Sequence, residues 1–421
     1  MTNGPVRYLT VIAAVMATLA SASQTAPQSD EPPPVFKAAD LLPADVARGP
    51  HYQVGDEVRT EGYFHEFTMT SDFGAFDAIG RSMLAVRIQE VGALAALQDV
   101  SKTEVFLAAA GQSVVKIGQT AANVVVDPVG TAKGLGAGFK RFGVNLGRRT
   151  QRAVDSQKDS SAAGDDGAKE GDKAEDSAPE SAAKSILGVT SATRRWAKKV
   201  GADPYTNNAI LRQALEDVGK VDAAGSIATK VVVPIPAVVG MTSSVGDLVW
   251  GKDPEEVRKI NEQRLKALTV PDAVAKKLFA NPHLTLTYQT RLVAALSAVK
   301  AKGCADYVQT AAEARHEREA LFFVESAEML QQWHARQPVV SVLTDSRALV
   351  ARDQGGHAAV LLPLDWVGWT TQTGEALTVI AIRARRELKA TQLQLVLTGE
   401  TSQRAARELA AQGWTIRAVP D

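Results

Sequence analysis

The sequence predicts an α+β protein that is predominantly helical. Residues 63–70 alternate between two sets of side chains and are rich in β-formers, a period of two that is typical of a strand. Residues 185–337 instead place apolar side chains three and four positions apart, as amphipathic helices do. Residues 338–421 mix short apolar runs with helical stripes, which predicts a small α/β domain at the C-terminal end.

The composition is that of a globular protein with more than one unit. Its 421 residues are 45% hydrophobic and 22% charged, which excludes a chain that is disordered throughout and a polytopic membrane protein. The 47 Lys and Arg residues balance 47 Asp and Glu residues, so no overall field attracts nucleic acid or anionic lipid. A single Cys excludes an internal disulfide and any metal site built on several cysteines.

Residues 1–22 are expected to be a secretory signal peptide. Arg7 precedes an uncharged run at 9–20, and Ala20-Ser21-Ala22 has the small-x-small pattern of a cleavage site. The alternative is an uncleaved anchor, but the apolar run is shorter than the roughly 20 residues that span a bilayer. The mature protein is therefore expected in the periplasm or outside the cell. It would begin with a disordered tether at 23–50, which is rich in Pro, Gln and Asp.

Residues 51–153 are predicted to form a β-hairpin followed by helices. The strand at 63–70 leads into Asp72-Phe73-Gly74, residues that suit a turn, and 75–79 then returns as its partner. A helix follows at 83–99, where apolar side chains recur at helical spacing.

A basic stretch at 105–152 is the most unusual part of the sequence. Seven Lys and Arg residues face one acidic residue there, so the stretch carries a charge of +6 in a neutral protein. Its second helix, after a break at Asp127-Pro128, places apolar side chains on one edge and most basic ones on the opposite face. The residues expected to contact lipid or a partner are Lys133, Leu135, Phe139, Lys140, Arg141, Phe142, Leu146 and Arg148.

Five glycines between positions 134 and 147 weaken this basic helix, so it needs a surface to fold against. That surface is either the core of the protein itself or an anionic membrane. Export and the lack of interleaved stacking residues argue against nucleic acid.

An acidic segment at 154–184 separates this part from a helical one. Residues 155–183 hold nine acidic side chains and three Lys among Ser, Ala and Gly, too little apolar surface to fold, so a disordered linker or a long exposed loop is expected. In the helical domain at 185–337, Asp253-Pro254 starts one helix, and 290–300 and 306–336 are further helices. An apolar stretch begins at Val231 and runs to Val249, with no charge until Asp247. It is either a buried element or a membrane span, and its Pro and Gly residues make it a poor span.

The C-terminal domain at 338–421 is expected to contain a βαβ unit, because its strands and helices alternate after an initial set of three strands. Its strands are predicted at 339–343, 348–351, 358–362, 393–397 and 414–417, with helices at 375–389 and 402–412.

The chain contains none of the common catalytic or nucleotide-binding motifs, and no metal or cofactor is expected. The glycines at 134–138 lack the flanking residues of a phosphate-binding loop. The six His residues lie scattered along the chain, and Cys304 is expected to be a small buried hydrophobic residue.

Two loops of the C-terminal domain are weaker candidates for a binding site. Asp365, Trp366 and Trp369 form one loop, which either binds a partner or is held in place by its own aromatic rings. Residues 398–402 lie between a strand and a helix, where ligands often bind in α/β sheets, although Ser402 is explained as a helix cap alone.

The function expected from these features is that of an exported, non-enzymatic binding or structural protein, peripheral to the membrane, with anionic lipid or an envelope protein as its partner. The alternative is an enzyme with a site in the C-terminal α/β domain. An enzyme would show a polar pocket with converging titratable groups, whereas a binding protein would show an apolar or basic surface patch.

We predict that the exported protein begins at Ser23, because cleavage after Ala22 fits the small residues at 20 and 22. Intact mass spectrometry of the exported protein tests this prediction. A mature form that retains residues 1–22 would show an anchor instead.

Overall fold

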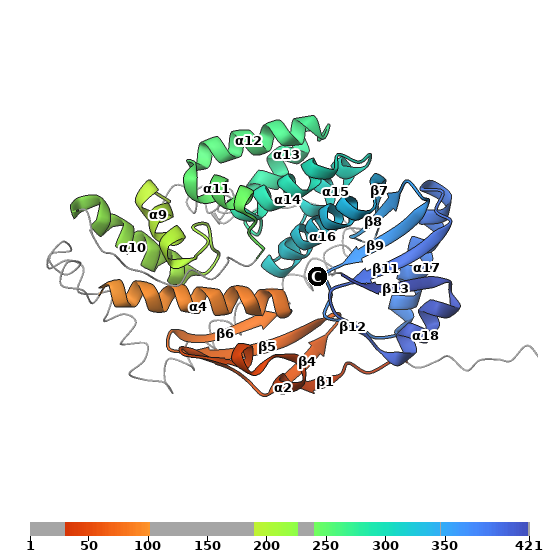
Figure 1. The fold of residues 1–421 in the computed structure, drawn as a ribbon, viewed down its shortest axis with the longest axis horizontal. Coiled ribbons are helices and arrows are strands. Elements are labelled where there is room, and N and C mark those ends of the chain that lie inside the picture. Colours follow the sequence, from red (N-terminus) through yellow and green to blue (C-terminus); the bar gives the residue numbers. More distant parts are fainter. Residues whose placement is uncertain (1–29, 102–188, 226–239, 346, 420–421) are drawn as a thin grey trace, which may run out of the picture.

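The computed structural model describes residues 30–101, 189–225, 240–345 and 347–419. Figure 1 shows an N-terminal sheet with a long helix against it, a group of helices, and a C-terminal sheet flanked by helices. The predicted signal peptide, the basic stretch at 105–152 and the acidic segment at 154–184 lie outside the described residues. Mixed helices and sheets confirm the α+β class.

The N-terminal sheet is antiparallel and is organised around one long strand. Strand β5 (Phe64–Ser71) pairs with β4 (Glu57–Glu61) along its first half and with β3 (Tyr52–Val54) along its second. On its other edge it pairs with β6 (Gly74–Ile79), which confirms the predicted hairpin. The remaining elements of this part are β1 (Val35–Lys37), α2 (Ala38–Leu41), α3 (Ala44–Ala47) and β2 (Arg48–Gly49).

Alternate side chains of β5 are buried, because one face of the sheet is covered. His65, Phe67 and Met69 point inward, and helix α4 (Arg81–Ser101) packs against the β5–β6 hairpin (Figure 1). Helix α4 contains the helix predicted at 83–99.

The prediction of a disordered tether at 23–50 is wrong from Val35 onward. Strand β1 pairs with β4, and the Phe36 ring packs edge-on against His65 and Trp366 with centroids 5.2 and 5.4 Å apart. A segment with few apolar residues is ordered here because it adds to a sheet that other residues have formed.

Eight helices follow in the described central part of the chain. Helix α14 (Leu286–Val299) lies at its centre, with eleven of its fourteen residues buried, and packs against α16 and α12. The others are α9 (Ser191–Val200), α10 (Ala209–Gly225), α11 (Ser243–Gly251), α12 (Pro254–Ala267), α13 (Asp272–Ala280), α15 (Cys304–Ala311) and α16 (Glu317–Arg336).

Two helix predictions in this region need correction. The single helix expected at 306–336 is two helices, α15 and α16, because the chain turns between them and His316 caps α16 by accepting from the Glu319 N–H. Helix α12 does begin at Asp253-Pro254, but the Asp253 side chain does not cap it and pairs with Arg194 instead. In the described ranges no helix is long and apolar enough to cross a membrane.

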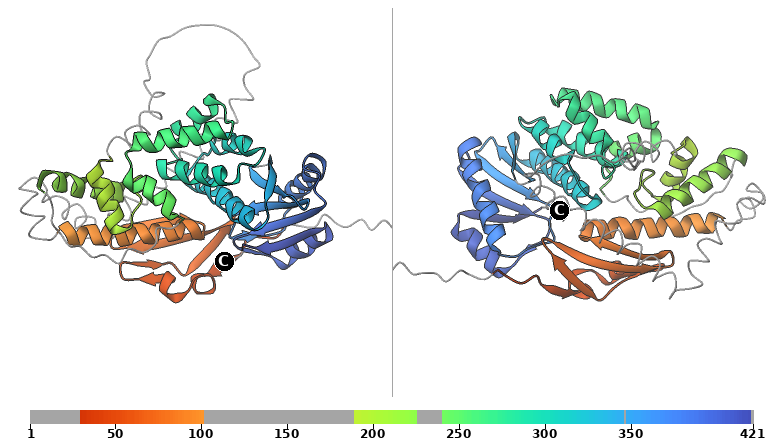
Figure 2. Two further views of the ribbon diagram at one scale, coloured as in Figure 1. Left: turned by 45° about the horizontal axis from the view of Figure 1, so that its top comes forward. Right: turned by 180° about the vertical axis from the view of Figure 1, so that it is seen from behind.

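The C-terminal unit is a five-stranded sheet in the order β13-β11-β9-β8-β7. Strands β9, β11 and β13 are parallel and are joined through α17 and α18, which confirms the predicted βαβ unit. Helices α17 and α18 pack on one face and α16 lies against the other (Figure 2). The elements are β7 (Val339–Asp345), β8 (Ala348–Asp353), β9 (His357–Leu362), β10 (Trp366–Val367), α17 (Thr371–Glu387), β11 (Gln392–Leu397), β12 (Glu400–Thr401), α18 (Gln403–Ala411) and β13 (Trp414–Ala418).

The buried carboxylate of Asp365 joins the N-terminal sheet to the C-terminal unit. It accepts hydrogen bonds from the backbone N–H of His65 at 3.0 Å and of Arg81 at 3.2 Å. Gly80 lies between these two donors with a φ of +94°, and a Cβ there would approach Arg318 and Phe64 to 3.3 Å. His65 in β5 and Arg81 at the start of α4 therefore donate to the same carboxylate, which belongs to the C-terminal unit.

We predict that Asp365→Ala lowers the free energy of unfolding by about 2–4 kcal/mol, because two buried N–H groups lose their only charged acceptor. Urea denaturation measures the effect. Asp72→Ala is the control, since Asp72 makes an exposed ion pair with His51 and should change stability by less than about 1 kcal/mol. Equal effects of the two substitutions would contradict the role given to Asp365.

Candidate functional site

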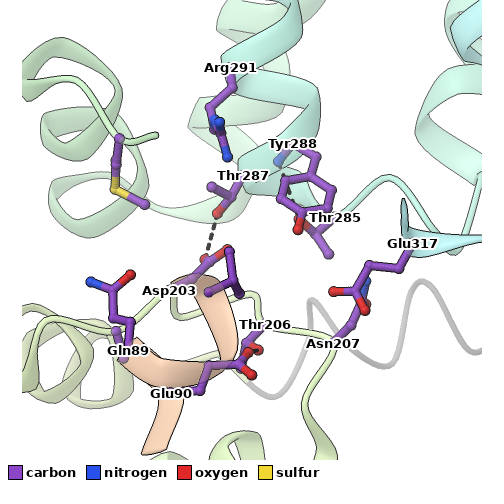
Figure 3. A pocket seen from close by; sticks show the side chains of 13 residues that line it. Gln89, Glu90, Asp203, Thr206, Asn207, Thr285, Thr287, Tyr288, Arg291 and Glu317 are labelled. Carbon is purple, nitrogen blue, oxygen red and sulfur yellow. Dashed lines mark hydrogen bonds between the residues drawn. The ribbon is translucent and has the colours of Figure 1, made fainter. Parts of the chain in front are cut away.

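A polar cavity lies where α4, the loop at 201–208, α14 and α16 meet (Figure 3). Its volume is about 40 Å³. That is room for about three water molecules, since one needs about 10–15 Å³. Carboxylate, guanidinium, hydroxyl and amide groups line it together with apolar side chains such as Val86 and Met241.

Local sequence explains how Asp203, Thr287 and Tyr288 reach the cavity. Gly201, with a φ of +66°, ends α9 and turns the chain into the loop that carries Asp203. Thr285 caps α14 by accepting from the Tyr288 N–H, which sets Thr287 and Tyr288 in the first turn of that helix.

Glu90 is buried and is bound by three side chains from two segments, α4 itself and the 201–208 loop. Its Oε2 accepts from Arg87 Nη1 at 2.8 Å and from Asn208 Nδ2 at 3.0 Å, and its Oε1 accepts from Thr206 Oγ1 at 2.5 Å. Arg87 also donates to Glu317 Oε2 at 2.6 Å. A buried carboxylate is tolerated only when it is paired and hydrogen-bonded in this way, so the network ties α4 to the 201–208 loop and to α16.

Arg291 forms the opposite wall of the cavity. Its guanidinium donates to both oxygens of Glu328 at 2.8 Å, and its side chain is only 5% exposed. Gly240 packs directly against it, and a Cβ at Gly240 would lie 2.1 Å from Nη2. No side chain fits at position 240 without moving the arginine.

Asp203 is the cavity group whose protonation changes near neutral pH. Its Oδ1 accepts from Thr287 Oγ1 at 2.6 Å and from the Tyr205 N–H at 2.9 Å. Burial raises the pKa of Asp203 to about 6, although these hydrogen bonds and the charge of Arg291 act in the opposite direction. A carboxyl group with this pKa is able to exchange a proton under physiological conditions.

The charged groups of the cavity are already paired within the protein. Glu90, Glu317 and Arg291 are each held by an ion pair within the protein. The cavity is far smaller than the roughly 300–1,000 Å³ of a typical ligand pocket. In the part of the chain that the structure describes, no group of three or more His, Cys, Asp or Glu residues is placed to hold a metal.

The residues that the sequence analysis selected lie elsewhere. Those of the basic helix, from Lys133 to Arg148, fall outside the described residues. Asp365 and Trp369 are buried, at 7% and 9% exposure, and Trp366 packs against Phe36. The loop is held by internal contacts, which was one of its two expected roles, and partner binding by Asp365, Trp366 and Trp369 stays a prediction.

Other single-residue expectations are met. Ser402 caps α18 by accepting from the Ala405 N–H. Cys304 is buried, and burial raises the pKa of its thiol to about 11, which makes it a poor nucleophile at neutral pH.

The cavity could not be predicted from the sequence because its members come from five separate segments. The available signal was a charged side chain within an apolar helix, as with Glu90 in α4 and Arg291 in α14. Comparison of the chain with protein-family models, with curated proteins and with solved structures finds no match.

We predict that Asp203→Asn stabilises the protein at pH 7 by on the order of 2 kcal/mol. The raised pKa means that the folded chain holds this proton more tightly than the unfolded chain does. The resulting stability is complete below the ordinary pKa of 3.8 and is lost as the pH rises through about 6. Asn keeps an oxygen for Thr287 and Tyr205 and carries no charge, so the gain should be present at pH 7 and absent at pH 4.

Urea denaturation between pH 4 and pH 8 measures this difference. Asp247→Asn, on an exposed position of α11, is the matched control and should leave the pH profile unchanged. If Asp203→Asn lowered stability equally at every pH, the carboxylate would be acting only as a hydrogen-bond acceptor.

Proposed function

We propose that the protein is an exported, non-enzymatic binding component of the cell envelope that contacts anionic lipid. The observation that carries the proposal is the outer face of α17, where exposed apolar side chains lie beside exposed arginines. Such a combination is typical of helices that lie on an anionic membrane surface.

Helix α17 is apolar on two sides. Leu377, Ile380 and Ala384 are buried against the C-terminal sheet, as a covering helix requires. Val379 and Ile382 face outward one turn apart and are 47% and 55% exposed. They are two of the few large apolar side chains that the described part of the chain leaves exposed, and each loses water contact when a surface covers it.

Basic side chains continue the same face. Arg385 and Arg386 follow Ile382 by one turn and are exposed, and Arg386 also pairs with Glu387 at 2.7 Å. Each basic residue near an anionic membrane contributes about 1 kcal/mol of attraction, and salt screens this contribution. Weak, salt-sensitive binding is expected from this face.

The basic helix at 132–149 supplies a second expected contact. It lies outside the described residues, so its part in the proposal rests on its charge and apolar stripe alone. Two separate contacts would act together, because the second forms from a high local concentration once the first is made.

The enzyme alternative draws on one observation, the raised pKa of Asp203. That residue lies beside α4 and α14, not in the C-terminal α/β unit where a catalytic site was expected. A cavity of about 40 Å³ also leaves no space for a substrate of ordinary size.

We predict that the mature protein floats with vesicles of anionic lipid at low salt and that Ile382→Asp reduces this binding several-fold. The substitution places a charge where an apolar side chain would enter the interface. Arg385→Gln with Arg386→Gln should chiefly reduce the dependence on salt. Phe139→Asp tests the second contact in the same assay. Co-sedimentation with neutral vesicles gives the baseline.

Ile210→Asp is the matched control, because Ile210 is a similarly exposed isoleucine, at 44%, on α10. It should bind vesicles as the unmodified protein does. The proposal fails if the unmodified protein ignores anionic vesicles at low salt, or if Ile382→Asp and Ile210→Asp behave alike.

A further inference from the structure

The carboxyl edge of the C-terminal sheet brings together the two loops that sequence analysis considered. Strands β10 and β12 pair in parallel there, with Trp366 opposite Glu400. Helices α17 and α18 both begin at this edge. In α/β sheets ligands bind at the carboxyl ends of parallel strands, and the N–H groups of helix N-termini attract anions.

We use the word crevice for this edge between the first residues of α17 and α18, where a carboxylate of the chain itself is bound. Glu31 Oε2 accepts from the Trp369 N–H at 2.5 Å and from Ser402 Oγ at 2.6 Å. The Glu31 N–H donates to the Trp369 carbonyl at 3.0 Å, so the main chain is recognised as well as the side chain. Ser402 is only 8% exposed, which makes its hydroxyl part of a built site rather than a surface contact.

The preceding residue occupies a second position in the crevice. Asp30 Oδ1 accepts from the Thr371 N–H at 2.7 Å and from Thr371 Oγ1 at 2.9 Å. These hydrogen bonds, with a smaller contribution from the charge of Arg404, hold the pKa of Asp30 below its ordinary value. The crevice thus receives two adjacent carboxylates at two distinct sets of donors.

Capping of the two helices does not explain these contacts. Thr370 already caps α17 by accepting from the Thr373 N–H, and Ser402 already caps α18. Asp30 and Glu31 accept hydrogen bonds from donors that the capping side chains do not satisfy, as a bound ligand would.

The connection between these carboxylates and β1 is short and rich in proline. Three prolines, Pro32 to Pro34, connect Glu31 to β1, and the first two are exposed. Of the hydrogen bonds described for this connection, the Thr60 N–H donates to the Pro34 carbonyl at 3.1 Å. Prolines provide a semi-rigid spacer with no N–H donors of their own, so occupancy depends mainly on the two acidic residues.

We infer that this crevice is a binding site for an acidic peptide, and that Asp30–Glu31 is a tethered occupant that an acidic segment of a partner protein replaces. The ligand carries two adjacent carboxylates on an extended main chain. The tether keeps the local concentration of Asp30–Glu31 high, so an outside peptide binds weakly until these residues are removed. The inference goes beyond the proposed lipid contact, which uses the outer face of α17 rather than its N-terminus.

The test uses the mature full-length protein and a labelled peptide that copies residues 27–34, with sequence PQSDEPPP. Fluorescence polarisation should show binding to the Asp30→Ala, Glu31→Ala variant at least about tenfold tighter than to the unmodified protein, because the internal competitor is gone. A peptide with Asn-Gln in place of Asp-Glu should not bind.

A second substitution tests the crevice itself. In the Asp30→Ala, Glu31→Ala background, Ser402→Asp keeps a good N-cap for α18 but places a carboxylate against the incoming one. It should abolish peptide binding while leaving the thermal unfolding midpoint unchanged. Thr371→Val, which removes one donor and keeps the backbone N–H, should weaken binding without abolishing it.

Three results would overturn the inference. The first is peptide binding that is no tighter after removal of Asp30 and Glu31, which would make these residues a structural contact only. The second is binding that survives Ser402→Asp. The third is displacement of the peptide by succinate at equal concentration, which would show that the main chain is not recognised and that the crevice takes any small dicarboxylate.

Discussion

The carboxylate of Asp365 is the contact on which the arrangement of this protein depends. It takes one N–H from β5 and another from the first residue of α4, 300 and 284 positions earlier in the chain. Both donors are backbone groups that need an acceptor once they leave water. The N-terminal sheet, helix α4 and the C-terminal unit therefore meet at one point, and Arg318 of α16 closes it by donating to the Pro363 carbonyl.

A second polar contact holds the middle of α4. Glu90 is bound by Arg87, Thr206 and Asn208, and Arg87 continues to Glu317 at the start of α16. Buried ion pairs of this kind contribute little net stability, because desolvation offsets their attraction. Their effect is to define one arrangement of the segments. The small cavity lies between these segments.

The C-terminal unit carries both proposed binding functions on helix α17. Its outward side presents Val379, Ile382 and two arginines, and its N-terminus lies over the crevice that holds Asp30 and Glu31. Lipid contact and acidic-peptide binding thus use different surfaces of one helix. A membrane and a peptide therefore need not compete for it.

The sequence by itself determined the elements whose pattern is local. The β5–β6 hairpin follows from a period of two and a turn at Asp72-Phe73-Gly74, and the order of strands and helices after Val339 is enough to predict the parallel pairs. Only the tertiary structure decided that Val35–Lys37 joins a sheet, and that Asp365 is buried between the N-terminal sheet and the C-terminal unit. It alone brought Glu90, Asp203 and Arg291 to one cavity, and Asp30 and Glu31 to one crevice. The physical reason is that these contacts join residues far apart in the chain, where periodicity carries no information. Burial then changes their chemistry, as the raised pKa of Asp203 shows, and burial is a property of the folded chain.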